Sequence, residues 1–201
     1  MLQVVGELRG LAARIEEMAR PGGEAGKVPI YGQRDALWAG ERLGHGATTI
    51  GEYGCAVTCL AMAVSAETGA RITPLEMNRR LVETCGGFVG PNGNLVVWAK
   101  VSEAVPELGF DEVIDCQSQP APVELINEVL AEGGYVLAQV DFQPGGEMDQ
   151  HWVLLTGRVG EGYWVNDPWD GRRFELPPAY CRVGWDAARA IFRVVVYRGT
   201  T

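Results

Sequence analysis

Residues 54–68 read GCAVTCLAMAVSAET, and Gly69 follows them. The stretch is apolar around nearly its whole circumference, which is typical of a helix buried in the middle of a domain. A glycine is common just after the last residue of a helix. We therefore predict a buried helix over Cys55–Thr68 whose first residue, Cys55, is presented from a rigid scaffold.

Cys55 is the candidate nucleophile. Unpaired backbone N–H groups and the helix dipole favour negative charge at the start of a helix, and the thiolate is the reactive form of cysteine. Gly54 permits a tight turn before it and leaves the approach to the sulfur uncrowded. The alternative is a core cysteine, which is the commoner place for this residue type.

The sequence on either side of this helix predicts its setting. Thr73, Pro74 and Glu76 have the spacing of a capped helix start, so a second helix is expected to run to about Thr84. Apolar residues at helical spacing predict two further helices, over 95–104 and 122–132. Runs of β-branched and aromatic residues predict strands over 134–142, 151–158, 162–165 and 190–197. Helices followed by antiparallel strands indicate an α+β domain with its helical layer packed against the sheet.

His151 and Asp167 are the candidate base and orienting acid. His151 begins a predicted strand, and Asp167 ends the next one, just before a proline that stops the strand pairing. A turn near 160–162 would bring the two strands side by side. In a Cys-His-Asp arrangement the histidine accepts the thiol proton and the acid holds the ring. Asn166 is expected to face the opposite way along its strand.

Two donors are expected to stabilise the oxyanion of a tetrahedral intermediate. The backbone N–H of Cys55 lies at the start of the predicted helix and is one of them. The side-chain amide of Gln33, on a segment leading towards the same helix, is a suitable neutral donor for the second. A glutamine alone is weak evidence for this role.

The order of these motifs resembles the papain-like peptidase domains related to bacteriocin-leader-processing peptidases, the C39-like domains. The resemblance spans about residues 28–197. It rests on Gln33, the segment 54–62, Thr73-Pro74 with Asn78, the segment 151–157, and Asn166-Asp167-Pro168. It implies a papain-like fold in which a central helix carries the nucleophile and packs on an antiparallel sheet.

The resemblance also implies an activity. The chain would be a cysteine peptidase that hydrolyses a peptide or isopeptide amide through a thioacyl intermediate, with Cys55, His151, Asp167 and Gln33 as the catalytic set and no cofactor. In the transporter-linked members the glutamine stands only a few residues before the cysteine and a glycine follows the cysteine. Here 21 residues intervene and Ala56 follows, so the chain is more similar to the stand-alone branch.

Composition limits the partners. The net charge of -9 and the absence of a Lys/Arg-rich run in the sequence disfavour nucleic acid and anionic membranes. With 47% hydrophobic and 21% charged residues in 201 positions, we expect one globular domain and no membrane span. The expected substrate is a peptide or a peptidoglycan-like cross-link.

The N-terminal residues are expected to be an appendage. Residues 1–20 predict an amphipathic helix, and a Gly-rich linker follows to residue 27, so the peptidase domain is expected over 28–201. The helix is a candidate surface for a protein partner or for self-association. Because it carries charges among its apolar positions it lacks the pattern of a signal peptide, which predicts cytoplasmic synthesis and leaves export by another route open.

The remaining reactive residues are interpreted mainly as structural or surface residues. The five cysteines are interpreted as mostly free thiols, and a structural zinc site is not expected, since no ligand pair has the usual spacing. His45 is interpreted as a loop residue and Cys59 as a core residue. Acidic loop residues able to select basic groups are Asp35, Glu52 and Asp149. Trp152 and Trp169 are candidates for a peptide platform beside the site.

Two other functions stay open at this stage. One is a papain-fold binding or structural module without turnover, docked to an assembly through residues 1–20. The other is acyl transfer to an amine, which would use the same residues.

Overall fold

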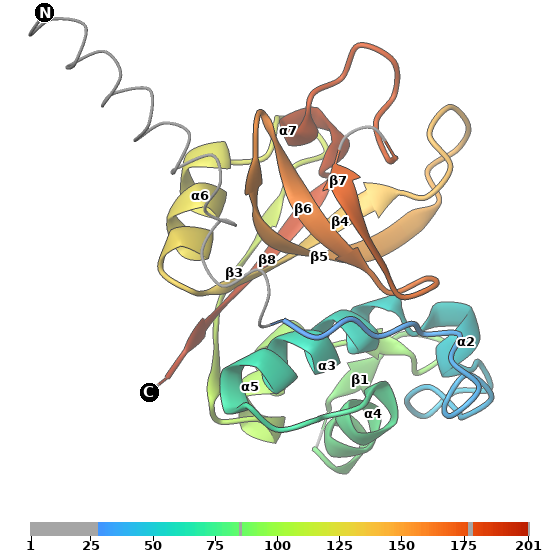
Figure 1. The fold of residues 1–201 in the computed structure, drawn as a ribbon. Helices are drawn as coiled ribbons and strands as arrows, with labels where there is room; N and C mark the ends of the chain where they lie inside the picture. Colours follow the sequence, from blue (N-terminus) through green and yellow to red (C-terminus); the bar gives the residue numbers. More distant parts are fainter. Residues whose placement is uncertain (1–27, 85, 177–178, 201) are drawn as a thin grey trace, which may run out of the picture.

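The computed structural model describes residues 28–84, 86–176 and 179–200. A helical layer and a six-stranded sheet lie one on the other (Figure 1). The helical layer contains α2 (Ile50–Tyr53), α3 (Cys55–Thr68), α4 (Pro74–Glu83) and α5 (Val101–Ala104). The prediction of a helix over residues 1–20 and a linker to residue 27 lies outside the described residues.

Helix α3 is the centre of the helical layer and has the predicted bounds. Its residues 57–65 are all buried, and Gly69 ends it in the left-handed conformation at φ 67°. Gly54 separates it from α2 at close range, because a Cβ there would lie 2.4 Å from the carbonyl oxygen of Ile50. The absence of a side chain at 54 therefore lets two helices meet at Cys55.

Helix α4 also begins where the sequence predicts. The hydroxyl of Thr73 accepts a hydrogen bond from the backbone N–H of Glu76 at 3.2 Å, and Pro74 occupies the first turn. The buried Asn78 side chain accepts from the N–H of Gly44 at 2.9 Å and donates to the carbonyl of Arg42 at 3.0 Å. Asn78 thus holds the loop that precedes α2.

The sheet is antiparallel with the strand order β3-β8-β4-β5-β6-β7. Its strands are β3 (Leu108–Asp115), β4 (Tyr135–Asp141), β5 (Gln150–Val159), β6 (Gly162–Asp167), β7 (Arg172–Leu176) and β8 (Arg193–Gly199). The predicted hairpin between the His151 and Asp167 strands is present, with Val159 opposite Gly162.

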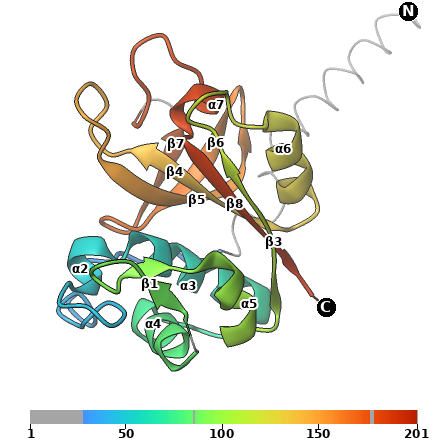
Figure 2. The same ribbon diagram turned by 180° about the vertical axis from the view of Figure 1, so that it is seen from behind.

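Both faces of the central strands are covered. Trp152 and Leu154 of β5 belong to the core shared with α3, whereas Val153 and Leu155 belong to a second core on the other face. Helices α6 (Val123–Ala131) and α7 (Ala187–Ala190) contribute to that second core, and Figure 2 shows them on the side away from α3. Since side chains alternate along a strand, β5 is anchored in both layers.

The predicted helix over 95–104 is wrong in its first part. Leu95–Val96 forms strand β2, paired with β1 (Phe88–Val89), and helical structure begins only with a 3-10 turn at Trp98–Lys100. Gly90 and Gly93 both have positive φ and close the turn between the two strands. Strand pairing therefore overrides the helical spacing here.

Within the described parts of the chain, no helix is long and apolar enough to cross a membrane.

Candidate active site

His151 and Asp167 are in direct contact. Nε2 of His151 lies 2.7 Å from Oδ1 of Asp167, and both side chains are buried. His151 stands near the start of β5 and Asp167 at the end of β6, so the hairpin carries both. A carboxylate only accepts hydrogen bonds, so Nε2 carries the proton of the neutral ring and Nδ1 has the free lone pair.

Cys55 interacts with the same imidazole. It is half-buried at the first position of α3. Burial disfavours the charged ring, but the hydrogen bond with Asp167 and the interaction with Cys55 outweigh it and raise the pKa of His151 to about 9. The ring therefore holds a second proton at neutral pH while it is paired with these two groups.

Asp167 is held by three donors. Besides the ring, the backbone N–H of Trp169 donates to Oδ1 at 2.8 Å and the hydroxyl of Tyr180 donates to Oδ2. Burial acts to raise the pKa of Asp167, but its hydrogen bonds lower that pKa below the usual value. Burial and the nearby Asp167 charge raise the pKa of Tyr180, so its hydroxyl keeps the proton that it donates. Asp167 is therefore a fixed anion.

Tyr180 is not among the candidates that the sequence pattern indicates. It stands outside the regular elements, thirteen positions after Asp167. An isolated tyrosine in an irregular segment has no periodic signal, and only the folded chain brings it to the carboxylate.

An aromatic group surrounds the imidazole. Phe142 lies 5.0 Å and Tyr180 5.7 Å from the His151 ring, measured between ring centroids, and Trp169 lies 4.9 Å from Phe142. Trp169 is therefore beside the site, as one reading of the sequence proposed. Trp152 is instead buried in the core against Trp98.

Gln33 is buried and is hydrogen-bonded to two segments, α2 and the residues that follow Asp167. Its amide Nε2 donates to the carbonyl of Gly51 in α2 at 3.1 Å, and its backbone N–H donates to the carbonyl of Pro168. Its side-chain oxygen is buried and has no hydrogen-bond partner among the described residues. The amide carries a second N–H, so Gln33 retains a donor next to the helix that precedes Cys55.

The other candidates serve structural contacts. Asn166 donates to the carbonyl of Pro29 at 3.2 Å and so points away from the imidazole, as expected. The buried Cys59 thiol donates to the carbonyl of Trp152 at 3.4 Å. Glu52 and Asp35 accept from nearby backbone N–H groups, of Thr49 and Leu37, at 2.9 Å each.

Two further candidates lie in connecting segments. His45 is exposed and lies edge-on to Phe88. Asp149 is exposed in the connection between β4 and β5. In the described residues no group of three or more His, Cys, Asp and Glu side chains is arranged to hold a metal ion.

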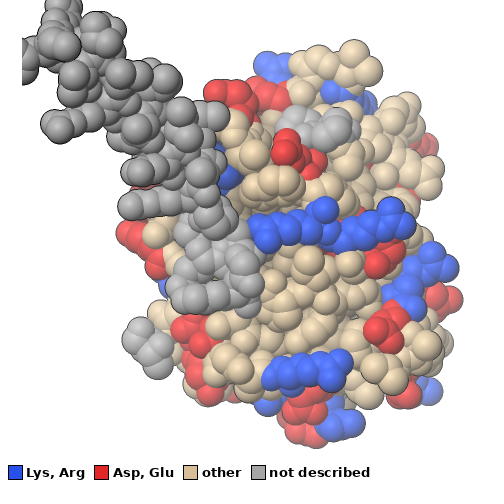
Figure 3. All heavy atoms as spheres, viewed as in Figure 1, with Lys and Arg blue, Asp and Glu red and all other residues tan. Residues whose placement is uncertain are grey.

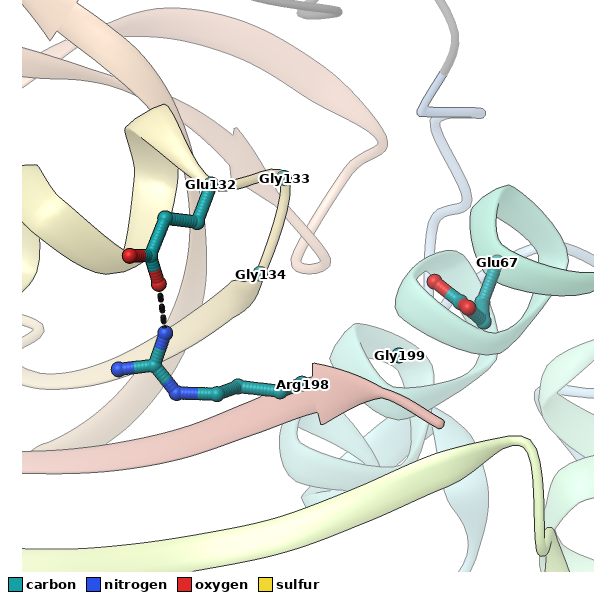
Figure 4. Close-up of a pocket in the computed structure, with 6 residues that line it drawn as sticks. All are labelled: Glu67, Glu132, Gly133, Gly134, Arg198 and Gly199. Carbon is teal, nitrogen blue, oxygen red and sulfur yellow. Dashed lines mark hydrogen bonds and ion pairs between the residues drawn. The ribbon is translucent and has the colours of Figure 1, made fainter. Parts of the chain in front are cut away.

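A hollow of about 280 Å³ lies elsewhere on the molecule, where α3 meets the turn before β4 and the end of β8 (Figure 4). It is lined by Glu67, Glu132, Gly133, Gly134, Arg198 and Gly199. Arg198 is paired with Asp111 at 3.0 Å and with Glu132. This hollow shares no residue with the Cys55 and His151 cluster.

The comparisons identify the fold. No family model and no curated protein sequence matches this chain. The structure matches a crystal structure from Bacillus anthracis assigned as a C39-like peptidase, with a TM-score of 0.53 and 15% identity over 87% of this chain and 96% of that chain. The fold is that of a C39-like peptidase. The predicted papain-like α+β architecture is thereby confirmed.

A second match is weaker. It is with interpain A, an active cysteine protease of Prevotella intermedia, at a TM-score of 0.36 and 16% identity. The match covers 66% of this chain and 56% of the length of that protein.

Proposed function

We propose that this chain is a cysteine peptidase that hydrolyses a peptide or isopeptide amide, with Cys55 as nucleophile, His151 as base and acid, and Asp167 as the group that orients the ring. The observation that carries the proposal is the 2.7 Å contact between His151 and Asp167 on an imidazole that also interacts with Cys55. The C39-like peptidase fold supports the same reaction class.

The first half of the reaction forms a thioester. The Cys55 thiol gives its proton to Nδ1 of His151, a ring whose pKa is raised to about 9. The sulfur attacks the carbonyl carbon, and the backbone N–H of Cys55 and the amide of Gln33 donate to the resulting oxyanion. The imidazolium then gives its proton to the departing amine as the carbon–nitrogen bond breaks.

The second half releases the acid. The neutral His151 ring accepts a proton from water, and the resulting hydroxide attacks the thioester carbonyl. The carbon–sulfur bond breaks, the acid leaves, and Cys55 and His151 again share one proton. Asp167 remains an anion throughout, because it stabilises the charge on the ring without taking its proton.

Selective alkylation tests the nucleophile without knowledge of the substrate. With iodoacetamide at pH 7, Cys55 should be labelled at least about tenfold faster than Cys59, Cys116 and Cys181, because only Cys55 is paired with a base. Peptide mapping of partly labelled protein gives each rate, and Cys55→Ala removes the fast phase. Equal rates for all the thiols would overturn the assignment.

Hydrolysis is tested next with the purified full chain and a peptide library. Products should appear with the unsubstituted protein and not with Cys55→Ala. Turnover in the presence of added amine acceptors separates hydrolysis from acyl transfer, because transfer would yield the new amide in place of the acid.

A further inference from the structure

An unpaired arginine is stacked beside the proposed site. The guanidinium carbon of the exposed Arg34 lies 4.8 Å from the centroid of the Trp169 ring. Among residues 28–84, 86–176 and 179–200, this guanidinium has no carboxylate partner. The planar face of Arg34 is thus covered by the indole, and its N–H groups are free to bind a ligand.

The backbone that carries Arg34 is fixed against the turn after β6. The N–H of Gln33 donates to the carbonyl of Pro168, and a Cβ on Gly32 would lie 3.1 Å from the backbone nitrogen of Gly171. The indole N–H of Trp38 also donates to the carbonyl of Gly32, at 2.8 Å. The adjacent Asp35 carboxylate is bound to the N–H of Leu37. The backbone at Arg34 is therefore held in place, and the Asp35 carboxylate does not neutralise the guanidinium charge.

A continuous series of rings leads from Arg34 to the imidazole. Trp169 lies 4.9 Å from Phe142, and Phe142 lies 5.0 Å from His151. In the proposed reaction His151 protonates the departing amine, so the leaving group is expected to lie against the His151 ring. An extended peptide advances about 3.3 Å per residue, so Arg34 would meet a group about two to four residues beyond the scissile bond.

The charge of Arg34 indicates the kind of ligand it would bind. Figure 3 shows Lys and Arg side chains in a band across the middle of one face of the molecule, with some Asp and Glu side chains beside it. The protein as a whole carries a net charge of -9. On a protein with this net charge, an arginine without a carboxylate partner, such as Arg34, is a favourable place for an acidic group.

We propose that Arg34, supported by Trp169, is a specificity determinant that selects substrates with a carboxylate on the leaving-group side of the scissile amide. This inference rests on the proposed function of Cys55 and His151. The carboxylate is either an acidic side chain or the C-terminal end of the peptide, and arginine binds both with the same paired N–H donors.

N-bromoacetyl tripeptides test the subsite, because they alkylate a thiolate and extend from it in the leaving-group direction. The Cys55 sulfur displaces bromide and forms a thioether. One probe has Glu at its second residue and a C-terminal amide. The second probe has Gln in place of that Glu and the same C-terminal amide, so it is neutral. A third has Gln and a free C-terminal carboxylate. Intact-mass measurements give each rate of Cys55 alkylation, with Cys55→Ala as the background.

The expected result is a preference within one protein. At least one of the two carboxylate probes should react about two- to fivefold faster than the neutral probe, as expected for an exposed ion pair. Which of them does so identifies the source of the carboxylate. The ratio should fall to about one in Arg34→Gln and invert in Arg34→Glu. Arg79→Gln removes the same charge from α4, and its ratio should equal that of the unsubstituted chain.

Two failures are distinguishable. If iodoacetamide labels Cys55 selectively but the carboxylate and neutral probes react equally, or if Arg34→Gln keeps the preference, the subsite is refuted and the peptidase proposal stands. If iodoacetamide shows no selectivity for Cys55, the proposed function fails and the subsite fails with it.

Discussion

Cys55 and Cys59 lie one turn apart on α3, yet their surroundings differ. Cys55 is half-buried at the start of the helix and interacts with His151. Cys59 is fully buried and donates to the carbonyl of Trp152. Burial, with the nearby charges of Cys55 and Asp167, raises the pKa of Cys59 well above its usual value. We infer that the helix end and the neighbouring base, and not the residue type, distinguish the two thiols.

The largest expected effect comes from removing the first of these thiols. Cys55→Ala should lower the rate of peptide hydrolysis by about a thousandfold or more, although Cys59 remains one turn away. The buried Cys59 cannot reach a substrate carbonyl. Initial rates with a peptide from the library measure this, and Cys116→Ala is the matched control. Retention of a tenth of the activity would mean that another group serves as nucleophile.

The next effect concerns the acid that holds the ring. Asp167→Asn should lower kcat by about a hundredfold or more, because an amide can donate to Nε2 and so favour the wrong tautomer. Alkylation of Cys55 should slow as well. Labelling of Cys59 should not change, since that thiol is limited by burial. An unchanged kcat would remove Asp167 from the mechanism.

The raised pKa values of His151 and Cys59 should also make the free energy of unfolding depend on pH in two separate ranges. A pKa that is raised on folding stabilises the folded state below the unfolded pKa, and this contribution is lost as the pH rises through the folded value. For His151 the loss should run from about pH 6.5 to 9 and amount to at most a few kcal/mol. For Cys59 the loss begins near pH 9.

Urea unfolding between pH 6 and pH 10 measures both ranges. His151→Gln should abolish the loss of stability in the lower range and leave it in the upper one, whereas Cys59→Ala should do the reverse. A free energy of unfolding that falls equally in both variants and in the unsubstituted chain would contradict the assignment.

The smallest effect is expected at Tyr180. Tyr180→Phe removes one hydrogen bond to Asp167, so kcat should fall about three- to tenfold. Because that bond helps to lower the pKa of Asp167, the acid limb of the kcat/KM profile should move to higher pH. Tyr163→Phe, which loses a hydroxyl contact with Asn127, is the control. An unmoved acid limb would limit Tyr180 to a packing role.

The sequence predicted the parts of the fold with strong local signals. The bounds of α3 follow from an uninterrupted apolar stretch ended by Gly69, and the β5–β6 hairpin follows from two apolar runs around a glycine turn. The edge strands β3 and β7 were missed. Each of them has charged residues at positions that face solvent, so an apolar alternation is hardly visible.

The candidate site was predictable as far as its residues belong to such elements. His151 and Asp167 meet because their strands pair, and Cys55 reaches them because α3 packs on β5. Tyr180, Phe142 and Arg34 lie in irregular segments or just beyond a strand. Their contacts depend on long-range packing, which no local pattern in the sequence encodes.

The close approach at Gly54 has a consequence for the geometry of the two proposed oxyanion donors. Gln33 is anchored to the carbonyl of Gly51 in α2, and α2 stands at its present distance from α3 because residue 54 has no side chain. A methyl group at position 54 would displace α2, and the Gln33 amide with it, from the start of α3. The position of the Gln33 amide relative to the start of α3 thus depends on a missing Cβ.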